Sequence, residues 1–373
     1  MSHLVVVGNS YIDFLNLRKP LLDELRKNNS KITLMGPKLK DQKYLKELTE
    51  NDTTYISFFI NPVNVNPLSN FFTFLDIVFK LKSLNPDKLL LFTLKPIVFG
   101  SIASFFLRNT KVFSLNSGLG RIFTRSSVYN KFVLFFLKPL LRLAFKFNER
   151  VIFQNKDDRE LFAKHGISPT SKSLVVNGTG IDLERFKFLK KTADEKPLKF
   201  LMISRLIEEK GLIYYYQAAK IIKKEYPEVT FFLLGNFCNS KSGISPKIIE
   251  SWQKANVIDY LGETNDVRPY LNDADIFVLP TYYREGVPRT CMEALATGLP
   301  IITSDVPGCK ETVKNNVNGF LIKPKSSDDL QNAMRRFIKA PQIIEEMSKK
   351  GRKLAEDKFD IIKVNNEIVN VMR

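Results

Sequence analysis

A chain of 373 residues with 44% hydrophobic residues exceeds what one hydrophobic core usually supports, which predicts two globular domains and excludes an intrinsically disordered protein. The net charge of +18 is concentrated in residues 1–190, which hold 29 Lys and Arg against 15 Asp and Glu. The three cysteines (Cys238, Cys291 and Cys309) have no paired spacing, which argues against a disulfide framework and against a zinc site.

The N-terminus and the longest apolar stretches indicate where in the cell the protein is expected. The opening MSHLVVVGNSYIDF has no basic segment followed by a long apolar run, so no signal peptide is expected. No stretch reaches about 18 uninterrupted apolar residues, so a membrane-spanning helix is not expected either. These features favour a protein of the cytoplasm.

Strand and helix signals alternate along the first half of the chain. Helical patterns at 17–29 and 97–109 follow apolar runs of strand length, and a turn is expected at Gly8-Asn9-Ser10. This alternation is typical of a doubly wound α/β domain with a parallel sheet. The strands of this half are predicted at residues 3–8, 31–37, 87–96 and 111–123, the last running into a glycine turn.

The alternation begins again after a polar stretch at 189–197, so a domain boundary is expected within 178–197. The predicted fold class is α/β, with two Rossmann-like domains facing each other across a cleft. We assign residues 1–180 to the first domain, 181–355 to the second, and 356–373 to a C-terminal helix that packs on the first. The strands of the second domain are predicted at 198–206, 229–236, 257–263, 274–282 and 299–305.

The segment from Thr53 to Asn148 combines basic charge with many Phe and Leu residues. It holds twelve Lys and Arg but only two acidic residues, Asp76 and Asp87. Its stretch YNKFVLFFLKPLLRLAFKF has the pattern of a basic amphipathic helix, which suits an anionic membrane surface. Two other interpretations are a buried helix with one solvated basic face and a nucleic-acid binder, although the sequence has no recognisable nucleic-acid-binding module.

Several types of binding site are excluded or disfavoured by their motifs. The first strand leads into GNSYIDF in place of G-x-G-x-x-G, and no Walker lysine loop is present, so neither a nicotinamide dehydrogenase nor a P-loop enzyme is predicted. Asp273 and Asp275 have the Asp-x-Asp spacing of a metal clip. However, they run directly into an apolar strand, which favours a turn or strand-edge role over metal binding.

The second half carries the elements of an anion site. Arg205 follows a predicted strand, and Lys210 stands five residues later, so both cations can reach a diphosphate at the carboxyl end of that strand. The alternative is an ordinary basic loop paired with Glu208 and Glu209.

Two glutamates flank a Gly-Val-Pro turn in REGVPRTCMEALATG, residues 284–298. Thr290 and Glu293 have the spacing of a capping box, which would explain Glu293 as part of a helix start. Capping does not explain Glu285. The alternative is that Glu285 accepts hydrogen bonds from sugar hydroxyls and Glu293 reaches a ribose diol, beside a helix start that favours phosphate.

With these motifs the sequence resembles glycosyltransferase family 4, whose members have the GT-B fold. The two glutamates separated by seven residues match the family pattern, as does R-L-x-x-x-K-G from Arg205 to Gly211. The first domain is similar to a bacterial subgroup that builds surface polysaccharides and lipid-linked oligosaccharides. The matching segments are residues 93–104, 116–123, 204–212, 231–236, 259–267, 274–313 and 318–322.

The resemblance implies a retaining transfer from a nucleotide sugar, with no metal and no other cofactor. The first domain would bind the acceptor and the second the nucleotide sugar. Glu285, Arg205 and Lys210 would be the catalytic residues, with Glu285 on the donor sugar and both cations on the departing diphosphate. The implied donor-binding residues are Glu293, Gly286, Val287, Pro288, Arg289, Thr290, Gly118, Gly120, Gly235, Tyr260, Leu261, Gly262 and Val267.

The sequence departs from the family at a histidine that many members carry after a strand of the first domain. The matching region here reads Thr93-Leu94-Lys95-Pro96. Lys95 either takes a charge role near a donor or acceptor phosphate or lies on the surface. Lys95 and Ser10 are the candidate acceptor or phosphate contacts.

We therefore expect a glycosyltransferase that moves a hexose or an N-acetylhexosamine, with UDP as the expected carrier, to a polyprenyl-diphosphate-linked saccharide. O-antigen, capsule or glycoprotein glycan assembly would use such a step. The basic first domain would bind the inner face of the cytoplasmic membrane, and no nucleic-acid partner is expected. The alternative is a catalytically inactive GT-B protein that binds a sugar nucleotide or a glycan and recruits other transferases.

Overall fold

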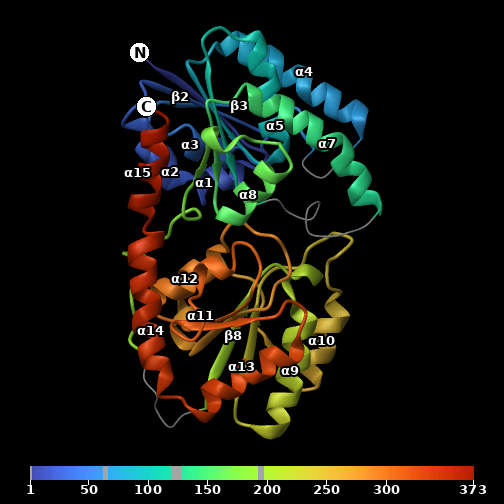
Figure 1. Cartoon of the computed structure of the whole chain (residues 1–373), viewed down its shortest axis with the longest axis vertical. Coiled ribbons are helices and arrows are strands. Elements are labelled where there is room, and N and C mark those ends of the chain that lie inside the picture. The colour runs from blue at the N-terminus through green and yellow to red at the C-terminus, as the bar shows by residue number, and fades with distance from the viewer. Residues whose placement is uncertain (1, 62–65, 119–127, 192–196) are drawn as a thin grey trace. The chain divides into compact units, whose positions relative to one another are not determined.

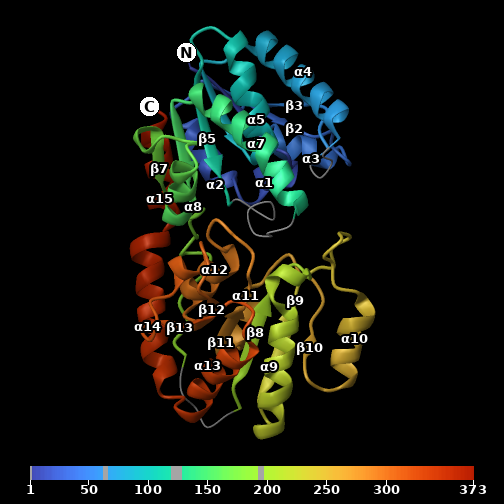
Figure 2. The same cartoon turned by 45° about the vertical axis from the view of Figure 1, so that its right-hand side comes forward.

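The computed structural model describes residues 2–61, 66–118, 128–191 and 197–373, without the side chains of 128–132. It divides into two compact units (Figures 1 and 2). The first unit comprises Met1–Thr179 together with Val364–Arg373, and the second comprises Gly180–Lys363. Each unit has its own parallel sheet, and each is described separately below.

The first unit is built on a parallel sheet whose described strands have the order β3-β2-β1-β4-β5-β6-β7. The central strands are apolar on both sides because helices cover both faces of the sheet. The strands are β1 (His3–Val7), β2 (Lys31–Gly36), β3 (Thr53–Ser57), β4 (Lys88–Phe92), β5 (Lys111–Asn116), β6 (Arg150–Phe153) and β7 (Ser173–Val175).

Two sets of helices cover the two faces of this sheet. Leu4 and Val6 of β1 pack with α1, α2, α3 and α15, whereas Val5 and Val7 pack with α4, α5, α7 and α8. Figure 1 shows α4, α5 and α7 along one face of the sheet. The helices are α1 (Tyr11–Leu15), α2 (Lys19–Arg26), α3 (Lys43–Leu48), α4 (Pro67–Leu84), α5 (Leu94–Ala103), η1 (Ser104–Phe106), α7 (Val128–Lys146), α8 (Lys156–Lys164), η2 (Thr170–Lys172) and α15 (Ile361–Val371).

The four strands predicted in this unit are present, but the structure corrects the end of one and adds three. The strand predicted at 87–96 ends at Phe92, and α5 begins at Leu94, because Pro96 fits the first turn of a helix, where its missing N–H costs nothing. Sequence analysis missed β3, β6 and β7. These strands are short or lie at the edge of the sheet, so their apolar runs are too brief or too polar to be distinctive.

The second unit has a parallel sheet whose described strands have the order β10-β9-β8-β11-β12-β13. All five predicted strands are found there, although β10 is only two residues long, and β13 was not predicted. The strands are β8 (Lys199–Ile203), β9 (Thr230–Leu234), β10 (Asp259–Tyr260), β11 (Ile276–Leu279), β12 (Ile301–Ser304) and β13 (Gly319–Ile322). The helices are η3 (Glu208–Lys210), α9 (Leu212–Glu225), α10 (Pro246–Lys254), α11 (Arg268–Asp273), α12 (Arg289–Thr297), η4 (Lys310–Thr312), α13 (Ser327–Lys339), α14 (Ile343–Leu354) and η5 (Ala355–Phe359).

In each sheet the strand order reverses direction at one place. The chain leaves β1 toward β2 on one side and β4 toward β5 on the other, and it leaves β8 toward β9 and β11 toward β12 in the same manner. The loops after two such neighbouring strands diverge and leave a crevice at the carboxyl ends, where open α/β sheets bind ligands. Ligand sites are therefore expected at the loops after β1 and β4 and at the loops after β8 and β11.

The end of the chain returns to the first unit. Val364, Ile368, Val369 and Met372 are buried in the core beside β1 and β2. Val364 lies four and five residues before Ile368 and Val369, which places these three on one face of α15. Met372 follows the end of the helix at Val371, close to the predicted end at 373.

Candidate active site

The loops after β8 and β11 are joined by hydrogen bonds. The backbone oxygen of Glu209 accepts hydrogen bonds from Thr281 Oγ1 at 2.8 Å and from the Tyr282 amide at 2.9 Å. Gly211 has a φ of 82°, and a Cβ atom there would lie 2.1 Å from the Pro280 oxygen, so only glycine allows the loops to approach this closely. The fold thus holds Lys210 next to the segment that carries Glu285.

Lys210 and Glu285 form an ion pair. Lys210 Nζ lies 2.6 Å from Glu285 Oε1, and the two side chains are only 10% and 15% exposed. A largely buried pair of this kind is held firmly, because removing one partner leaves the other charge buried and uncompensated. Sequence analysis named both residues but paired Lys210 with a diphosphate or with neighbouring glutamates, and did not predict this contact.

Arg205 and Tyr283 belong to the same neighbourhood. Burial raises the pKa of the Tyr283 hydroxyl, and the nearby positive charges of Arg205 and Lys210 partly offset that rise. Lys210 Nζ lies 6.0 Å from the centre of the Tyr283 ring. The Arg205 side chain is exposed. Sequence analysis missed Tyr283, although its position two residues before Glu285 was a signal.

Glu293 is buried on α12, and the structure corrects the predicted capping box. The helix begins at Arg289 with Pro288 as its N-cap, and no side chain caps it, so Thr290 already lies inside the first turn. Pro288 has the fixed φ that suits a helix start. Glu293 Oε1 instead accepts a hydrogen bond at 2.9 Å from Arg289 Nε, one turn earlier. Burial raises the pKa of Glu293, and the Arg289 charge lowers it in part.

The turn between Glu285 and Pro288 is packed against Gly308. Gly308 has a φ of 83°, and a Cβ atom there would lie 2.1 Å from the Gly286 oxygen and 2.6 Å from the Glu285 oxygen. Gly286, Val287 and Pro288 are themselves buried. Gly308, which was not among the predicted site residues, therefore packs directly against the backbone that carries Glu285.

Replacing Gly308 by alanine is expected to lower the free energy of unfolding by about 2 kcal/mol, because the methyl group would add steric overlap to a strained φ. Urea unfolding measures this loss. Gly166→Ala is the matched control, since Gly166 also has a positive φ but a Cβ there would have no neighbour closer than 3.7 Å. Equal losses in the two variants would show that the contact with the Glu285 turn does not matter.

Five of the implied donor-binding residues, Gly235, Tyr260, Leu261, Gly262 and Val267, follow or end β9 and β10. Tyr260 Oη donates a hydrogen bond to the Gly235 oxygen at 2.8 Å, and the Gly235 amide donates to the Gly262 oxygen at 2.8 Å. A Cβ atom on Gly235 would lie 1.8 Å from the Ser204 oxygen, so this cluster touches the start of the Arg205 loop. Leu261 and Val267 pack against the same core. Phe237, missed by sequence analysis, lies 5.5 Å from the Tyr260 ring.

The candidate residues of the first unit follow three different strands: Ser10 follows β1, Lys95 lies in the first turn of α5 after β4, and Gly118 follows β5. Ser10 caps α1, and Gly118 has a φ of 106°. Lys95 Nζ donates hydrogen bonds to the Asn61 oxygen at 2.7 Å and to Asn70 Oδ1 at 2.9 Å, and burial lowers its pKa. Gly120 lies outside the described residues.

The two aspartates of the Asp-x-Asp sequence both contact Lys199. Asp275 Oδ2 accepts a hydrogen bond from the Lys199 amide at 2.9 Å, and Asp273 Oδ1 lies 2.7 Å from Lys199 Nζ. These contacts tie α11 to the start of β8. In the part of the chain that the structure describes, no group of three or more His, Cys, Asp or Glu side chains has the arrangement of a metal site.

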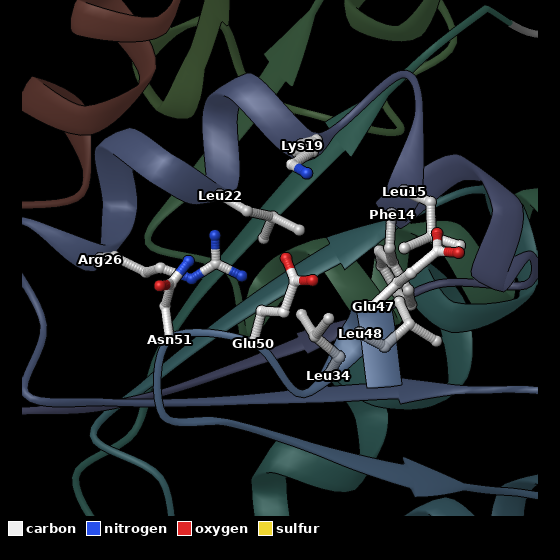
Figure 3. A pocket seen from close by; sticks show the side chains of 10 residues that line it. All are labelled: Phe14, Leu15, Lys19, Leu22, Arg26, Leu34, Glu47, Leu48, Glu50 and Asn51. Atoms are coloured by element: carbon white, nitrogen blue, oxygen red, sulfur yellow. The ribbon is translucent and has the colours of Figure 1, made fainter. Parts of the chain in front are cut away.

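Figure 3 shows a small hollow in the first unit that is not a candidate site. Lys19, Arg26, Glu47 and Glu50 surround a floor of leucine side chains, and the hollow encloses about 20 Å³. That is room for a single water molecule and not for a sugar ring.

One face of the first unit exposes many phenylalanines. They come from α4, η1 and α7, and their exposed fractions reach 68% at Phe79 and 72% at Phe135. The Phe105 ring lies 5.8 Å from Phe147 at the end of α7, which joins two of these elements. None of the helices in the described ranges is long and apolar enough to cross a bilayer. We call this surface the phenylalanine face: Phe71, Phe72, Phe79, Phe105, Phe106, Phe135 and Phe136.

Comparison with known proteins finds one family whose model matches part of the chain, and relatives that are similar over most of it. Residues 184–354 match the family described as "Glycosyl transferases group 1". The chain is 28% identical over 338 residues to the N,N'-diacetylbacillosaminyl-diphospho-undecaprenol alpha-1,3-N-acetylgalactosaminyltransferase of Campylobacter jejuni, covering 87% of this chain and 86% of the relative. It is 31% identical to an Escherichia coli UDP-Gal:alpha-D-GlcNAc-diphosphoundecaprenol alpha-1,3-galactosyltransferase, covering 65% of this chain and 64% of that protein.

Solved structures share the whole fold. The Anabaena protein HepE, solved in complex with UDP, superposes with a TM-score of 0.77 at 19% identity, covering 100% of this chain and 99% of its own. A sucrose-phosphate synthase from Thermosynechococcus elongatus superposes with a TM-score of 0.79 at 16% identity, covering 100% of this chain and 98% of its own. These likenesses confirm the predicted α/β architecture. Over residues 184–354 the chain is therefore similar to the group 1 glycosyltransferases, and it has the GT-B fold.

Proposed function

We propose that this protein transfers a hexose or an N-acetylhexosamine from a UDP-sugar to a saccharide linked to a polyprenyl diphosphate, with retention of the anomeric configuration. The observation that carries the proposal is the buried Lys210–Glu285 ion pair where the strand order of the second sheet reverses, with Arg205 in the adjacent loop. A donor diphosphate needs positive charge at this position, and a donor sugar needs a fixed hydrogen-bond acceptor.

Each residue of this site has a defined task in the proposed reaction. The bond between the anomeric carbon and the diphosphate oxygen breaks, the acceptor hydroxyl oxygen bonds to that carbon on the same face, and its proton passes to the released diphosphate oxygen. Lys210 and Arg205 neutralise the charge that develops on the leaving diphosphate. Glu285, held by Lys210, accepts hydrogen bonds from the donor sugar, and Glu293 accepts them from the ribose. The two cations supply charge that a metal ion supplies in other transferases, so the proposed reaction needs none.

The substrate classes follow from the relatives. The Campylobacter jejuni and Escherichia coli proteins are named for acceptors linked to undecaprenol through a diphosphate, and the latter is named for a UDP-sugar donor. The identity with the Campylobacter jejuni protein extends over 87% of this chain, which includes most of the first unit. This supports the same class of acceptor here.

The phenylalanine face supports docking on a membrane. A group of exposed apolar side chains marks a membrane or protein contact, and a lipid-linked acceptor requires a membrane nearby. Lys82 is exposed, and its Nζ lies 5.8 Å from the centre of the Phe106 ring, which suits anionic headgroups. Two basic residues of α7 have contacts inside the unit: Arg142 donates to the His165 and Gly166 oxygens, and Lys138 Nζ lies 3.4 Å from His165 Nδ1. Insertion of phenylalanine therefore contributes more than charge.

A donor panel tests the proposed reaction. Purified protein is incubated with UDP- and GDP-sugars and with undecaprenyl-diphosphate-linked mono- and disaccharides, and product is followed by mass spectrometry. We expect one UDP-sugar to extend one acceptor, at a rate that EDTA does not change. Donor binding without any transfer would instead support a catalytically inactive protein that recruits other transferases.

The raised pKa of Glu293 predicts a pH-dependent donor affinity. Arg289 and Arg185 lower this pKa and Asp266 raises it, but burial dominates and moves it above its ordinary value of 4.5. As the pH falls toward this raised pKa, Glu293 takes up a proton and its hydrogen bond to the ribose weakens, so the donor KM should rise. Glu293→Gln should raise the donor KM about tenfold at neutral pH and make it insensitive to mildly acidic pH.

The raised pKa of Glu293 also predicts that stability depends on pH, in the direction opposite to donor affinity. Because the folded state holds the Glu293 proton more tightly than the unfolded chain, the free energy of unfolding falls as the pH rises from 4.5 to the raised pKa. Glu293→Gln should remove this part of the pH dependence. Urea unfolding at several pH values measures it, and identical profiles for the two proteins would contradict the assignment.

A further inference from the structure

The first unit has a pocket at the place where its own strand order reverses. Loops after β1, β4 and β5 surround it, and it encloses about 70 Å³. Neighbouring strands of an open α/β sheet diverge at such a place, so their carboxyl ends form a natural ligand crevice. Every residue that lines this pocket belongs to the first unit.

Asp13 contributes a half-buried carboxylate to the wall of this pocket. Within the described residues its carboxylate oxygens receive no hydrogen bond, although Arg18 is close enough to lower the Asp13 pKa against the rise that burial causes. The Arg18 guanidinium donates to Ser117 Oγ at 2.5 Å and lies 4.5 Å from the centre of the Phe92 ring. Because partly buried carboxylates are usually satisfied, Asp13 has hydrogen-bonding capacity available for a ligand.

Thr93 adds a second, independent observation. It lines the pocket with φ 68° and ψ 157°, a conformation that is essentially limited to glycine. Backbone strain of this kind persists where the surrounding structure enforces it, and it concentrates at ligand sites. The strained residue directly follows β4, on the opposite side of the crevice from the loop that leads to Asp13.

The chemistry of the pocket fits a neutral sugar better than a phosphate. Asp13 would repel an anion, whereas Arg18 is already bonded to Ser117 and stacked on Phe92. A carboxylate and hydroxyls on an apolar floor of Phe14, Leu17 and Phe92 suit the hydroxyl groups and the C–H face of a sugar. The enclosed volume accommodates one substituent of the ring, with the rest of the sugar outside.

We propose that this pocket binds the acceptor's sugar, with Asp13 accepting a hydrogen bond from one of its hydroxyl groups and Arg18 positioning Ser117. This inference rests on the proposed function, because it assigns the acceptor subsite of that reaction. It adds two residues, Asp13 and Arg18, that neither the motifs nor the comparisons single out.

The test compares wild type with Asp13→Asn, which removes the charge and keeps the shape. Transfer to an undecaprenyl-diphosphate-linked monosaccharide should show an acceptor KM at least about tenfold higher, with an unchanged donor KM and an unchanged rate of UDP release in the absence of acceptor. Asp41→Asn, on an exposed loop of the same unit, is the matched control and should leave all three values unchanged. An unchanged acceptor KM in Asp13→Asn, or an equal rise in the donor KM, would overturn the proposal.

Two additions keep this test decisive. If Asp13→Asn does not fold, Ser10→Ala in the same pocket should raise the acceptor KM about fivefold. If wild type transfers no sugar at all, the proposed function fails while the pocket is still tested. Saturation-transfer NMR with the methyl glycoside of N-acetylglucosamine should then show contact in wild type and loss of contact in Asp13→Asn, and equal signals in both would overturn the inference.

Discussion

Replacing Lys210 by methionine is expected to lower kcat for sugar transfer about 100- to 1000-fold, the loss typical of removing one fixed donor from a site where negative charge develops. Two effects combine. The leaving diphosphate loses a cation, and Glu285 loses the partner that holds it at 2.6 Å. Steady-state transfer with the donor found in the panel measures the loss.

Three companion variants separate these effects. Lys241→Met removes an exposed lysine of the same unit and should leave kcat unchanged. Glu285→Gln should also lower kcat, and the double variant should lose much less than the product of the two single losses, since the residues act as a pair. Lys210→Met should cost about 3 kcal/mol of stability because it leaves Glu285 with little solvent. Full activity in Lys210→Met would contradict the assigned site.

Removing four residues of the phenylalanine face is expected to abolish membrane binding. Phe71, Phe72, Phe135 and Phe136 are each more than half exposed, and burying about half of each ring in lipid contributes about 1 kcal/mol. Replacing all four by serine should therefore weaken binding to anionic vesicles about 1000-fold. Co-sedimentation with phosphatidylcholine and phosphatidylglycerol vesicles measures this, and most of the wild-type binding should persist at high salt.

The control for this experiment lies on the second unit. Ile213, Ile221, Ile248 and Ile362 are also exposed, and replacing all four by serine removes a similar number of apolar side chains. That variant should bind vesicles as wild type does. Equal binding by both quadruple variants would show that the phenylalanine face contacts something other than lipid.

Much of the fold could be predicted because it depends on local patterns. Apolar runs of strand length gave β1, β2, β4 and β5 and the five predicted strands of the second unit. The strands β3 and β7 were missed for different reasons. In β3 the sequence TTYIS has no apolar run because the strand lies at the edge of the sheet, and β7 is only three residues long. Their place in the sheet is decided by neighbours that are distant in sequence.

The active site was only partly accessible from the sequence. Motif spacing identified Arg205, Lys210, Glu285 and Glu293, but the contact between Lys210 and Glu285 spans 75 positions and depends on which loops meet beyond β8 and β11. The capping box failed because Pro288 starts the helix earlier than Thr290. Asp13 has no motif at all. Its interest comes from a half-buried carboxylate that receives no hydrogen bond within the described residues, which only the fold decides.

The anomeric configuration of the transferred sugar is the sharpest test of a retaining transfer at Glu285 and Arg205. The product from the active UDP-sugar and the undecaprenyl-diphosphate-linked acceptor would be released by mild acid, and its new linkage determined by NMR. We expect one added sugar in the same α configuration as in the donor, formed by wild type and lost in Glu285→Ala and Arg205→Ala. A β linkage, or a product that both variants still form, would contradict it.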